Sequence, residues 1–290
     1  MKLKAKNAML LSVAAIAVAV AGCASNGIST AKENAMSTNY KPQVTELLKS
    51  IETGDAKPVG YINPEKYTQH NLAVGDGLVG FGAVLQALPK GSAKVNTVRV
   101  FQDGDFVFAH TDYNFFGPKI GFDIFRFEGG KIVEHWDNLQ EKPVTSNPSG
   151  RSMIDGPTAA VDLEKTTANK KLVAAFVDDI LVNGRMDKLA GYYDGDNYHQ
   201  HNPQIADGLS GLGKALEAMA KAGVSMKYEQ VHKVLGEGNF VLTASEGQFG
   251  GKHVAFYDLF RVDNGKIAEH WDTIEAIPAR SEWKNSNGKF

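Results

Sequence analysis

The apolar residues of this chain follow two different periods, and the order of these periods is repeated once. Helical spacing comes first in each half, over 44–51 and over 172–181, and each run ends at a glycine. Alternating, β-branched and aromatic positions then predict strands at 95–101, 106–111, 120–127 and 132–137, and at 226–235, 240–245, 253–262 and 267–272. The pattern predicts two α+β units, each with helices packed on a curved antiparallel sheet of about four strands.

One segment, Asp123 to Asp137, shows that these halves are copies of each other. It recurs as Asp258 to Asp272 with ten of fifteen positions identical at an offset of 135 residues. An upstream motif, Tyr-x-Gln-His-Asn, occurs at 67–71 and again at 198–202. A match of this density at this spacing indicates two copies of a whole domain rather than stacked small repeats.

The remaining segments suggest a division of the 290 residues. We expect domains at 41–153 and 166–290, joined by a proline- and glycine-containing linker at 154–165. Their ends, Asn-Pro-Ser-Gly-Arg at 147–151 and Asn-Ser-Asn-Gly-Lys at 285–289, resemble each other, so a tail is assigned to each domain. Residues 23–40 are small and polar and are expected to form a tether.

The first 22 residues have the features of an export signal. A basic start and an apolar run precede Val-Ala-Gly-Cys23, which resembles a bacterial lipobox, and Cys23 is the only cysteine. We expect Cys23 to be lipidated and the protein to be anchored in the cell envelope, facing the periplasm, with Ala24 favouring the outer membrane. An ordinary secretory signal with an incidental cysteine is the alternative.

Composition excludes several classes of function. With 43% apolar and 22% charged residues the chain is an ordinary globular protein, and its net charge of −2 and scattered basic residues exclude nucleic acid as a partner. The sequence has no glycine-rich phosphate loop, serine-hydrolase elbow or dinucleotide fingerprint, so we expect no cofactor.

The turn of the repeated hairpin determines which of its side chains share a face. A three-residue loop ending in glycine pairs Phe127 with Lys131, which places Asp123 opposite His135, with Asp137 on the same face. A two-residue loop would put Asp123 on the opposite face from His135 and Asp137. We predict the three-residue loop and an acid–base site at Asp123, His135 and Asp137, repeated at Asp258, His270 and Asp272.

The upstream motif supplies further candidates. We predict that Tyr67, His70 and Asn71, with their counterparts Tyr198, His201 and Asn202, contact a bound ligand; helix capping is the alternative for the histidines and asparagines. His199 and His201 resemble a metal pair, but Thr68 replaces the first histidine in the other copy, so we predict no metal. Trp136 and Trp271 should face away from the site and pack in a core or at the interface between the domains.

The order of these elements and the motif Arg-Phe-x-x-Gly-Lys-Ile-Val-Glu-His-Trp-Asp resemble the SnoaL-like polyketide-cyclase branch of the nuclear transport factor 2-like superfamily. The resemblance covers both copies and implies two tandem cone-shaped domains with sheets of four to six strands. It also implies that Asp137 and Asp272 act as acid or base in aldol-type chemistry. The family's cyclases have a histidine fourteen residues earlier, where this chain has Asp123 and Asp258.

Three functions remain open from the sequence. The first is cofactor-independent acid–base chemistry of the aldol, isomerase or cyclase type on a small hydrophobic carbonyl compound. The second is non-catalytic binding of a small hydrophobic molecule in the same cavities. The third is an interaction scaffold in which the two domains form an internal pseudo-dimer.

Overall fold

The computed structural model describes residues 38–89 and 91–290. The predicted signal peptide, Cys23 and nearly all of the predicted tether lie outside the described residues. Within the described part of the chain, no helix is long and apolar enough to cross a membrane.

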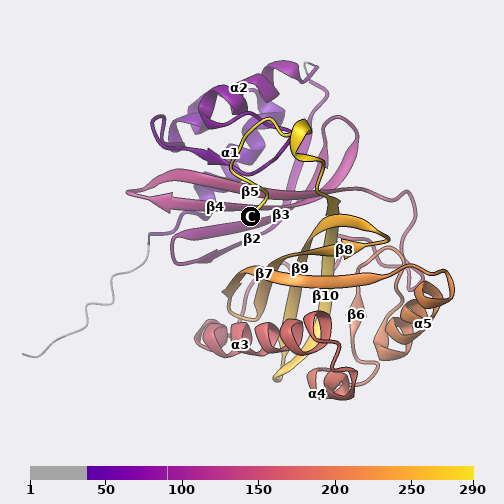
Figure 1. The fold of residues 1–290 in the computed structure, drawn as a ribbon. Coiled ribbons are helices and arrows are strands. Elements are labelled where there is room, and N and C mark those ends of the chain that lie inside the picture. The colour runs from indigo at the N-terminus through magenta and orange to yellow at the C-terminus, as the bar shows by residue number, and fades with distance from the viewer. Residues whose placement is uncertain (1–37, 90) are drawn as a thin grey trace, which may run out of the picture. The chain divides into compact units, whose positions relative to one another are not determined.

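The first repeat is a five-stranded mixed sheet with helices on one face (Figure 1). Its strands are ordered β1-β5-β4-β3-β2, and all neighbours are antiparallel except the short β1, which runs parallel to β5. Its elements are α1 (Lys41–Thr53), η1 (Lys57–Tyr61), β1 (Thr68–Gln69), α2 (Gly77–Ala87), β2 (Lys94–Asp103), β3 (Phe106–Asn114), β4 (Pro118–Glu128) and β5 (Lys131–Glu141).

The second repeat has the same topology, with strand order β6-β10-β9-β8-β7. Its helical elements are η2 (Leu163–Lys165), α3 (Thr166–Phe176), the π-helical η3 (Val177–Val182), η4 (Met186–Lys188), α4 (Leu189–Tyr192), α5 (Gly208–Lys221) and η5 (Arg280–Glu282). Its strands are β6 (His199–Gln200), β7 (Met226–Glu237), β8 (Phe240–Phe249), β9 (Lys252–Asp263) and β10 (Lys266–Ala276).

These two units confirm the predicted α+β class. Each sheet has five strands, within the predicted four to six; in each, a two-residue strand is added in parallel to the antiparallel strands, β1 on β5 and β6 on β10. These strands come from the Tyr-x-Gln-His-Asn motif, which is too short and polar to show an alternating pattern.

The alternation of side chains along the strands divides the buried residues into three cores. One face of each sheet packs on its own helices, around Val44 and Leu47 in the first repeat and around Val173 and Phe176 in the second. The opposite faces of both sheets contribute to a third core, which contains Trp136 and Trp271 together with residues such as Phe101, Phe122, Phe240, Leu242 and Tyr257. The expectation that both tryptophans pack away from the acidic residues is therefore confirmed.

The hairpin between β4 and β5 differs from the prediction. Glu128 pairs with Lys131, so the loop has two residues, Gly129 and Gly130, both with positive φ (57° and 77°), as a type I′ turn requires. Val133 then forms a β-bulge, beyond which Asp123 pairs with Asp137 rather than with His135. The extra residue in the strand compensates for the shorter loop, so Asp123 still lies on the same face of the sheet as His135 and Asp137.

The hairpin between β9 and β10 repeats this arrangement. Its loop is Asn264-Gly265, again with positive φ at both positions, and the register shifts between Ile267 and Glu269, so that Asp258 pairs with Asp272. In both repeats the predicted register is therefore wrong, whereas the predicted common face is correct.

The tails contact the repeat that they do not follow in sequence. Asn147, at the end of the first repeat, donates from Nδ2 to the carbonyl oxygens of Gln200 and Ile205 (2.6 and 3.0 Å). Asn285, at the end of the second, donates to those of Asn71 and Val74 (2.7 and 2.9 Å). Each tail thus braces the loop that carries the other repeat's Tyr-x-Gln-His-Asn motif.

Close packing at Gly211 predicts a matched pair of substitutions on α5. A Cβ at Gly211 would lie 2.3 Å from the carbonyl oxygen of Ala206, whereas one at Gly213 meets nothing within 4 Å. We expect Gly211→Ala to lower the free energy of unfolding by about 1–3 kcal/mol, and Gly213→Ala to leave it unchanged or raise it by about 0.5–1 kcal/mol. Urea denaturation of both variants checks this, and equal effects would contradict the packing.

Candidate active site

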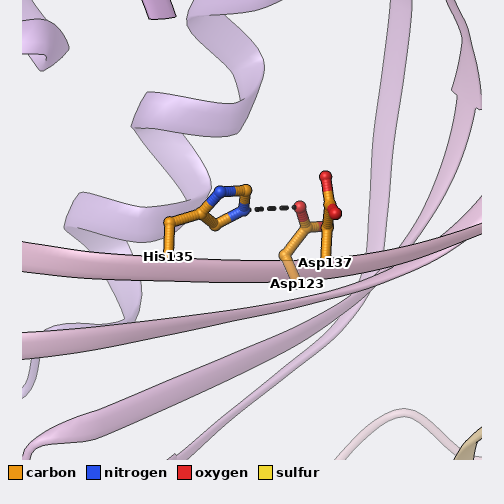
Figure 2. Close-up of side chains that lie close together, drawn as sticks. All are labelled: Asp123, His135 and Asp137. Atoms are coloured by element: carbon orange, nitrogen blue, oxygen red, sulfur yellow. Dashed lines mark hydrogen bonds and ion pairs between the residues drawn. The ribbon is translucent and has the colours of Figure 1, made fainter. Parts of the chain in front are cut away.

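Each repeat gathers two aspartates and a histidine on the helix-facing side of its sheet. Figure 2 shows the group of the first repeat. In the first, Asp123 and Asp137 lie opposite each other on β4 and β5, and His135 Nε2 is 3.2 Å from Asp123 Oδ1. In the second, His270 Nε2 is 3.0 Å from Asp258 Oδ1, and Asp272 lies opposite Asp258. All six residues are at most 9% exposed, so the three predicted catalytic candidates of each repeat come together in a buried cluster.

A glutamine holds each histidine ring in one orientation. In the second repeat, Gln200 Oε1 lies 2.9 Å from the backbone nitrogens of both His201 and Asn202, which can only donate. The same oxygen lies 3.0 Å from His270 Nδ1, so Nδ1 must also carry a hydrogen and donate. Gln69 Oε1 holds His135 Nδ1 in the same way in the first repeat, at 3.0 Å.

This orientation makes each histidine and its neighbouring aspartate share one proton. With Nδ1–H directed at the glutamine, two arrangements allow a hydrogen bond between His270 Nε2 and Asp258. Either the histidine is protonated and its Nε2–H donates to the carboxylate, or Asp258 is protonated and donates to Nε2. Burial lowers the pKa of His270, but the hydrogen bond to Asp258 and the charges of Asp272 and Asp258 outweigh it, and the net pKa is raised. In the first repeat, burial raises the pKa of Asp123.

A tyrosine hydroxyl completes each aspartate–histidine pair. Tyr113 donates to Asp123 Oδ2 at 2.7 Å, and Tyr228 donates to Asp258 at 3.1 Å. Burial and the adjacent aspartate raise the pKa of both phenols well above the usual value, so both remain donors at neutral pH. Sequence comparison misses them because Tyr113 lies on β3 and Tyr228 on β7, at positions that do not correspond in the two repeats.

The cross-strand pairing explains how two different strands supply the same hydroxyl. Tyr113 pairs with Val95 on β2, and Tyr228 pairs with Gly247 on β8. Strands β2 and β7 are equivalent, as are β3 and β8, so the tyrosine is on β3 in the first repeat and on the strand equivalent to β2 in the second. A Cβ at Gly247 would lie 2.0 Å from the carbonyl oxygen of Lys227, so this position accepts only glycine without displacement of the backbone.

The second aspartate of each cluster has a different environment. Asn202 Nδ2 donates to Asp272 Oδ2 at 2.7 Å, and the backbone nitrogen of Gln204 donates to Asn202 Oδ1, which fixes the orientation of the amide. Asp272 Oδ1 is buried and has no hydrogen-bond partner among the described residues. Burial raises the pKa of Asp272, with the charge of Asp258 acting in the same direction.

A cavity of about 450 Å³ lies beside this cluster in the second repeat. Its wall includes Asp258, His270, Asp272 and Asn202, while the rest is mainly aromatic and aliphatic, with contributions from Phe176, Tyr193, Tyr198, Leu216, Met219, Tyr228 and Phe260. Gln140 of β5, in the first repeat, also lines it. An apolar cavity of this size with few convergent polar groups is typical of a small-molecule site.

The motif residues predicted to contact ligand are divided between two sides of the sheet. Asn71 and Asn202 bond the second aspartates, at 2.6 and 2.7 Å, and Tyr198 lines the cavity. The buried Tyr67 has its hydroxyl 3.5 Å from Gln69 Nε2.

The two motif histidines lie elsewhere, which corrects the prediction made for them. His70 stacks on Trp136 and His201 on Trp271, in the core opposite the acidic residues. His201 Nδ1 donates to the carbonyl oxygen of Ser152 at 2.7 Å, and its Nε2 faces Glu269 Oε1 at 2.8 Å. His70 makes the same contacts with Gly288 and Glu134, at 2.9 and 3.0 Å. Neither ring faces the acid–base cluster.

The two clusters could also supply ligands to a cation. In each, one histidine nitrogen and two carboxylate oxygens lie within 4.8 Å of one another. The predicted absence of a metal rested on His199 and His201, which do not belong to this group, and it stays a prediction.

Comparisons with known proteins concern one repeat at a time. Residues 173–270 match the model of the SnoaL-like domain family. No curated protein matches the chain. Similar solved structures include TsrD from Streptomyces laurentii (20% identity, 36% of this chain and 92% of that one, TM-score 0.30) and a LEH-like epoxide hydrolase from M. tuberculosis (26%, 38% and 85%, 0.30). A SnoaL-like polyketide cyclase from Agrobacterium tumefaciens is also similar (13%, 37% and 91%, 0.30). Likeness at this level assigns no reaction, so the chemistry must be argued from side chains.

The unpartnered oxygen of Asp272 predicts an unusual effect on stability. Because its pKa is raised on folding, ionised Asp272 costs stability at every pH above its folded pKa. Asp272→Asn removes this cost and keeps the bond from Asn202, so it should stabilise the protein at pH 8 by on the order of 1 kcal/mol for each unit of the shift. The gain should vanish near pH 4.

Asp137→Asn is the matched comparison. Asp137 Oδ1 has the Lys289 ammonium at 3.7 Å, so this substitution should destabilise the protein at pH 8. Denaturant titrations of both variants at pH 4 and pH 8 test the contrast, and equal destabilisation by the two would contradict it.

Proposed function

We propose that the second repeat catalyses cofactor-independent acid–base chemistry on a small, mainly apolar carbonyl compound bound in its cavity. The observation that carries the proposal is that Asp272, a buried carboxylate with one unpartnered oxygen among the described residues, lines a mainly apolar cavity beside the hydrogen-bonded Asp258–His270 pair. A carboxylate that is stripped of donors and desolvated is a stronger base than one in water. The match of residues 173–270 to the SnoaL-like family supports the same assignment.

The site provides two groups with separate proton-transfer roles. The Asp272 carboxylate would take a proton from the carbon next to the carbonyl, and Asn202 holds this carboxylate in place through Oδ2. The electron pair of the broken C–H bond moves to the carbonyl oxygen. The Asp258–His270 pair and Tyr228, all of which line the cavity, would donate to that oxygen as its charge develops. Return of the proton at another atom gives isomerisation, and attack of the enolate carbon on a second carbonyl gives an aldol product.

Non-catalytic binding is the second candidate function. The apolar wall of the cavity favours it, because such a wall binds a hydrophobic molecule whether or not a reaction follows. Under this alternative Asp272 serves only to orient the ligand, and its replacement by asparagine leaves affinity intact.

We also propose that the protein is attached by lipid at Cys23 to the cell envelope and faces the periplasm, with the outer membrane as its site. The Val-Ala-Gly-Cys23 sequence after a basic and apolar start supports this. Cys23→Ser should move the full-length protein from the membrane fraction to the soluble periplasmic fraction, and mass spectrometry should show the loss of acyl chains. An unmodified Cys23 in the wild-type protein would contradict the anchor.

A proton-exchange assay tests the catalytic proposal without knowledge of the full reaction. Wild-type protein in D₂O should accelerate α-hydrogen exchange of at least one member of a panel of small apolar ketones and aldehydes, followed by ¹H NMR. Asp272→Asn should slow this exchange by about 100-fold or more. Since only the ionised base reacts, the wild-type rate should rise with pH through a pKa above the ordinary value of 3.8.

The control is Asp187→Asn, an exposed aspartate of the same repeat, which should leave the rate unchanged. Because Asp272→Asn is expected to be at least as stable as the wild type, unfolding would not explain its loss of activity. Exchange that survives in Asp272→Asn would reject Asp272 as the base. Binding of panel compounds without any exchange would favour the second candidate function.

A further inference from the structure

The Lys289 side chain enters the acid–base cluster of the first repeat. Lys289 is 6% exposed, and its Nζ lies 2.5 Å from Glu275 Oε2 and 3.7 Å from Asp137 Oδ1. It belongs to the tail that follows the second repeat and that braces the loop of Asn71. The oxygen that Lys289 approaches is the counterpart of Asp272 Oδ1, and Asp272 lines the cavity of the second repeat.

The corresponding residue of the other tail does not enter the second repeat's cluster. Arg151 takes the place of Lys289 in the Asn-x-x-Gly-basic sequence, and it pairs with Asp207 at 2.9 Å, about a third exposed to solvent. Neither Asp137 Oδ1 nor Asp272 Oδ1 has a hydrogen-bond partner among the described residues, but only Asp137 forms an ion pair with a lysine there. The cavity beside Asp272 remains open. Asp76, the counterpart of Asp207, is bonded instead to Asn287 at 2.9 Å.

Gln140 and Glu275 are equivalent residues of the two repeats that differ in charge. Gln140 of β5 and Glu275 of β10 each reach across to the other repeat, where Gln140 Oε1 accepts from the backbone nitrogen of Ile274 (2.9 Å) and Glu275 accepts from that of Leu139 (3.1 Å). Gln140 is neutral and lines the cavity of the second repeat. Glu275 has a carboxylate, which binds Lys289; burial raises the pKa of Glu275, and the Lys289 ammonium opposes this shift.

We propose that each chain has one ligand site, in the second repeat and completed by Gln140 of the first, and that the Lys289 side chain fills the equivalent site of the first repeat. The choice between glutamine at 140 and glutamate at 275 determines which site is open. A buried glutamate beside Asp137 needs a cation, which Lys289 supplies; a neutral amide beside Asp272 needs none. The ligand that fits the open site is neutral, with an apolar body and an acceptor for the amide of Gln140.

Charges of the surrounding groups are consistent with this division. Burial lowers the pKa of Lys289, but the charges of Glu275 and Asp137 together have a larger effect in the opposite direction. The net pKa is therefore raised, and the ammonium stays charged. A charged lysine held by two carboxylates does not leave readily, because removal would strand both in a poorly solvated site.

Dye stoichiometry tests the proposal independently of any catalysis. The probe is N-phenyl-1-naphthylamine, a neutral apolar dye whose fluorescence rises in apolar surroundings, with the bound number read by titration and native mass spectrometry. Wild-type chain should bind one dye, and Ala215→Trp, which fills the cavity of the second repeat, should bind none. The double variant Glu275→Gln, Lys289→Met, which gives the first repeat the arrangement of the second, should bind two.

Two control variants locate the additional site. Adding Ala215→Trp to the double variant should return the count to one, now in the first repeat. Arg151→Met removes the equivalent basic residue of the other tail and should leave one dye bound. A wild-type count of zero or two, or a count of one in a folded double variant, would overturn the proposal.

Acylation of wild-type lysines provides a second test that does not depend on folding of a variant. Lys289 should react with an acetylating reagent about tenfold or more slowly than Lys221, since its amine is accessible only after local opening. The side chain of Lys221 is 74% exposed. Equal rates for the two lysines would show that the first repeat's site is not filled.

Discussion

Two buried carboxylates face each other across paired strands in each repeat, and this opposition organises the residues around them. Asp258 and Asp272 are cross-strand partners, as are Asp123 and Asp137. Two carboxylates on directly paired strand positions in a poorly solvated site cannot both be ionised unless other groups compensate their charge. The second repeat separates their roles: His270 and Tyr228 compensate Asp258, while Asp272 receives one amide bond and keeps a bare oxygen. Two carboxylates in different environments have different proton affinities, as acid–base catalysis requires.

The first repeat solves the same problem with a cation. Lys289 approaches Asp137 and Glu275, so an ammonium group offsets the negative charge of these carboxylates inside the protein. The two repeats carry equivalent clusters, and each tail contacts the other repeat; under our proposal, this lets the tail of the second repeat fill the site of the first. The same tail segments contact His70 and His201 through the carbonyl oxygens of Gly288 and Ser152. The motif histidines thus link each tail to the core around the tryptophans.

Sequence reasoning recovered the repeat, the α+β class, the common face of the acidic residues and the inward packing of the tryptophans. It failed on the hairpin register, because a two-residue turn followed by a bulge places the same side chains on one face as a three-residue loop does. Gln69 and Gln200 were visible in the repeated motif, but only the structure shows that they orient the histidines. Tyr113 and Tyr228 were hidden because they lie on different strands. Lys289 was hidden because a tail's sequence does not reveal which repeat it contacts.

The account depends most directly on where the histidine protons are. In protein with ¹⁵N-labelled histidine, long-range ¹H–¹⁵N correlation spectra report the protonation of each ring nitrogen, and a Gln200→Ala variant identifies the His270 signals. Near neutral pH, His270 Nδ1 should be protonated and hydrogen-bonded to Gln200, with Nε2 sharing a proton with Asp258. A bare Nδ1 beside Gln200, with a proton confined to Nε2, would contradict the division of roles between the two aspartates.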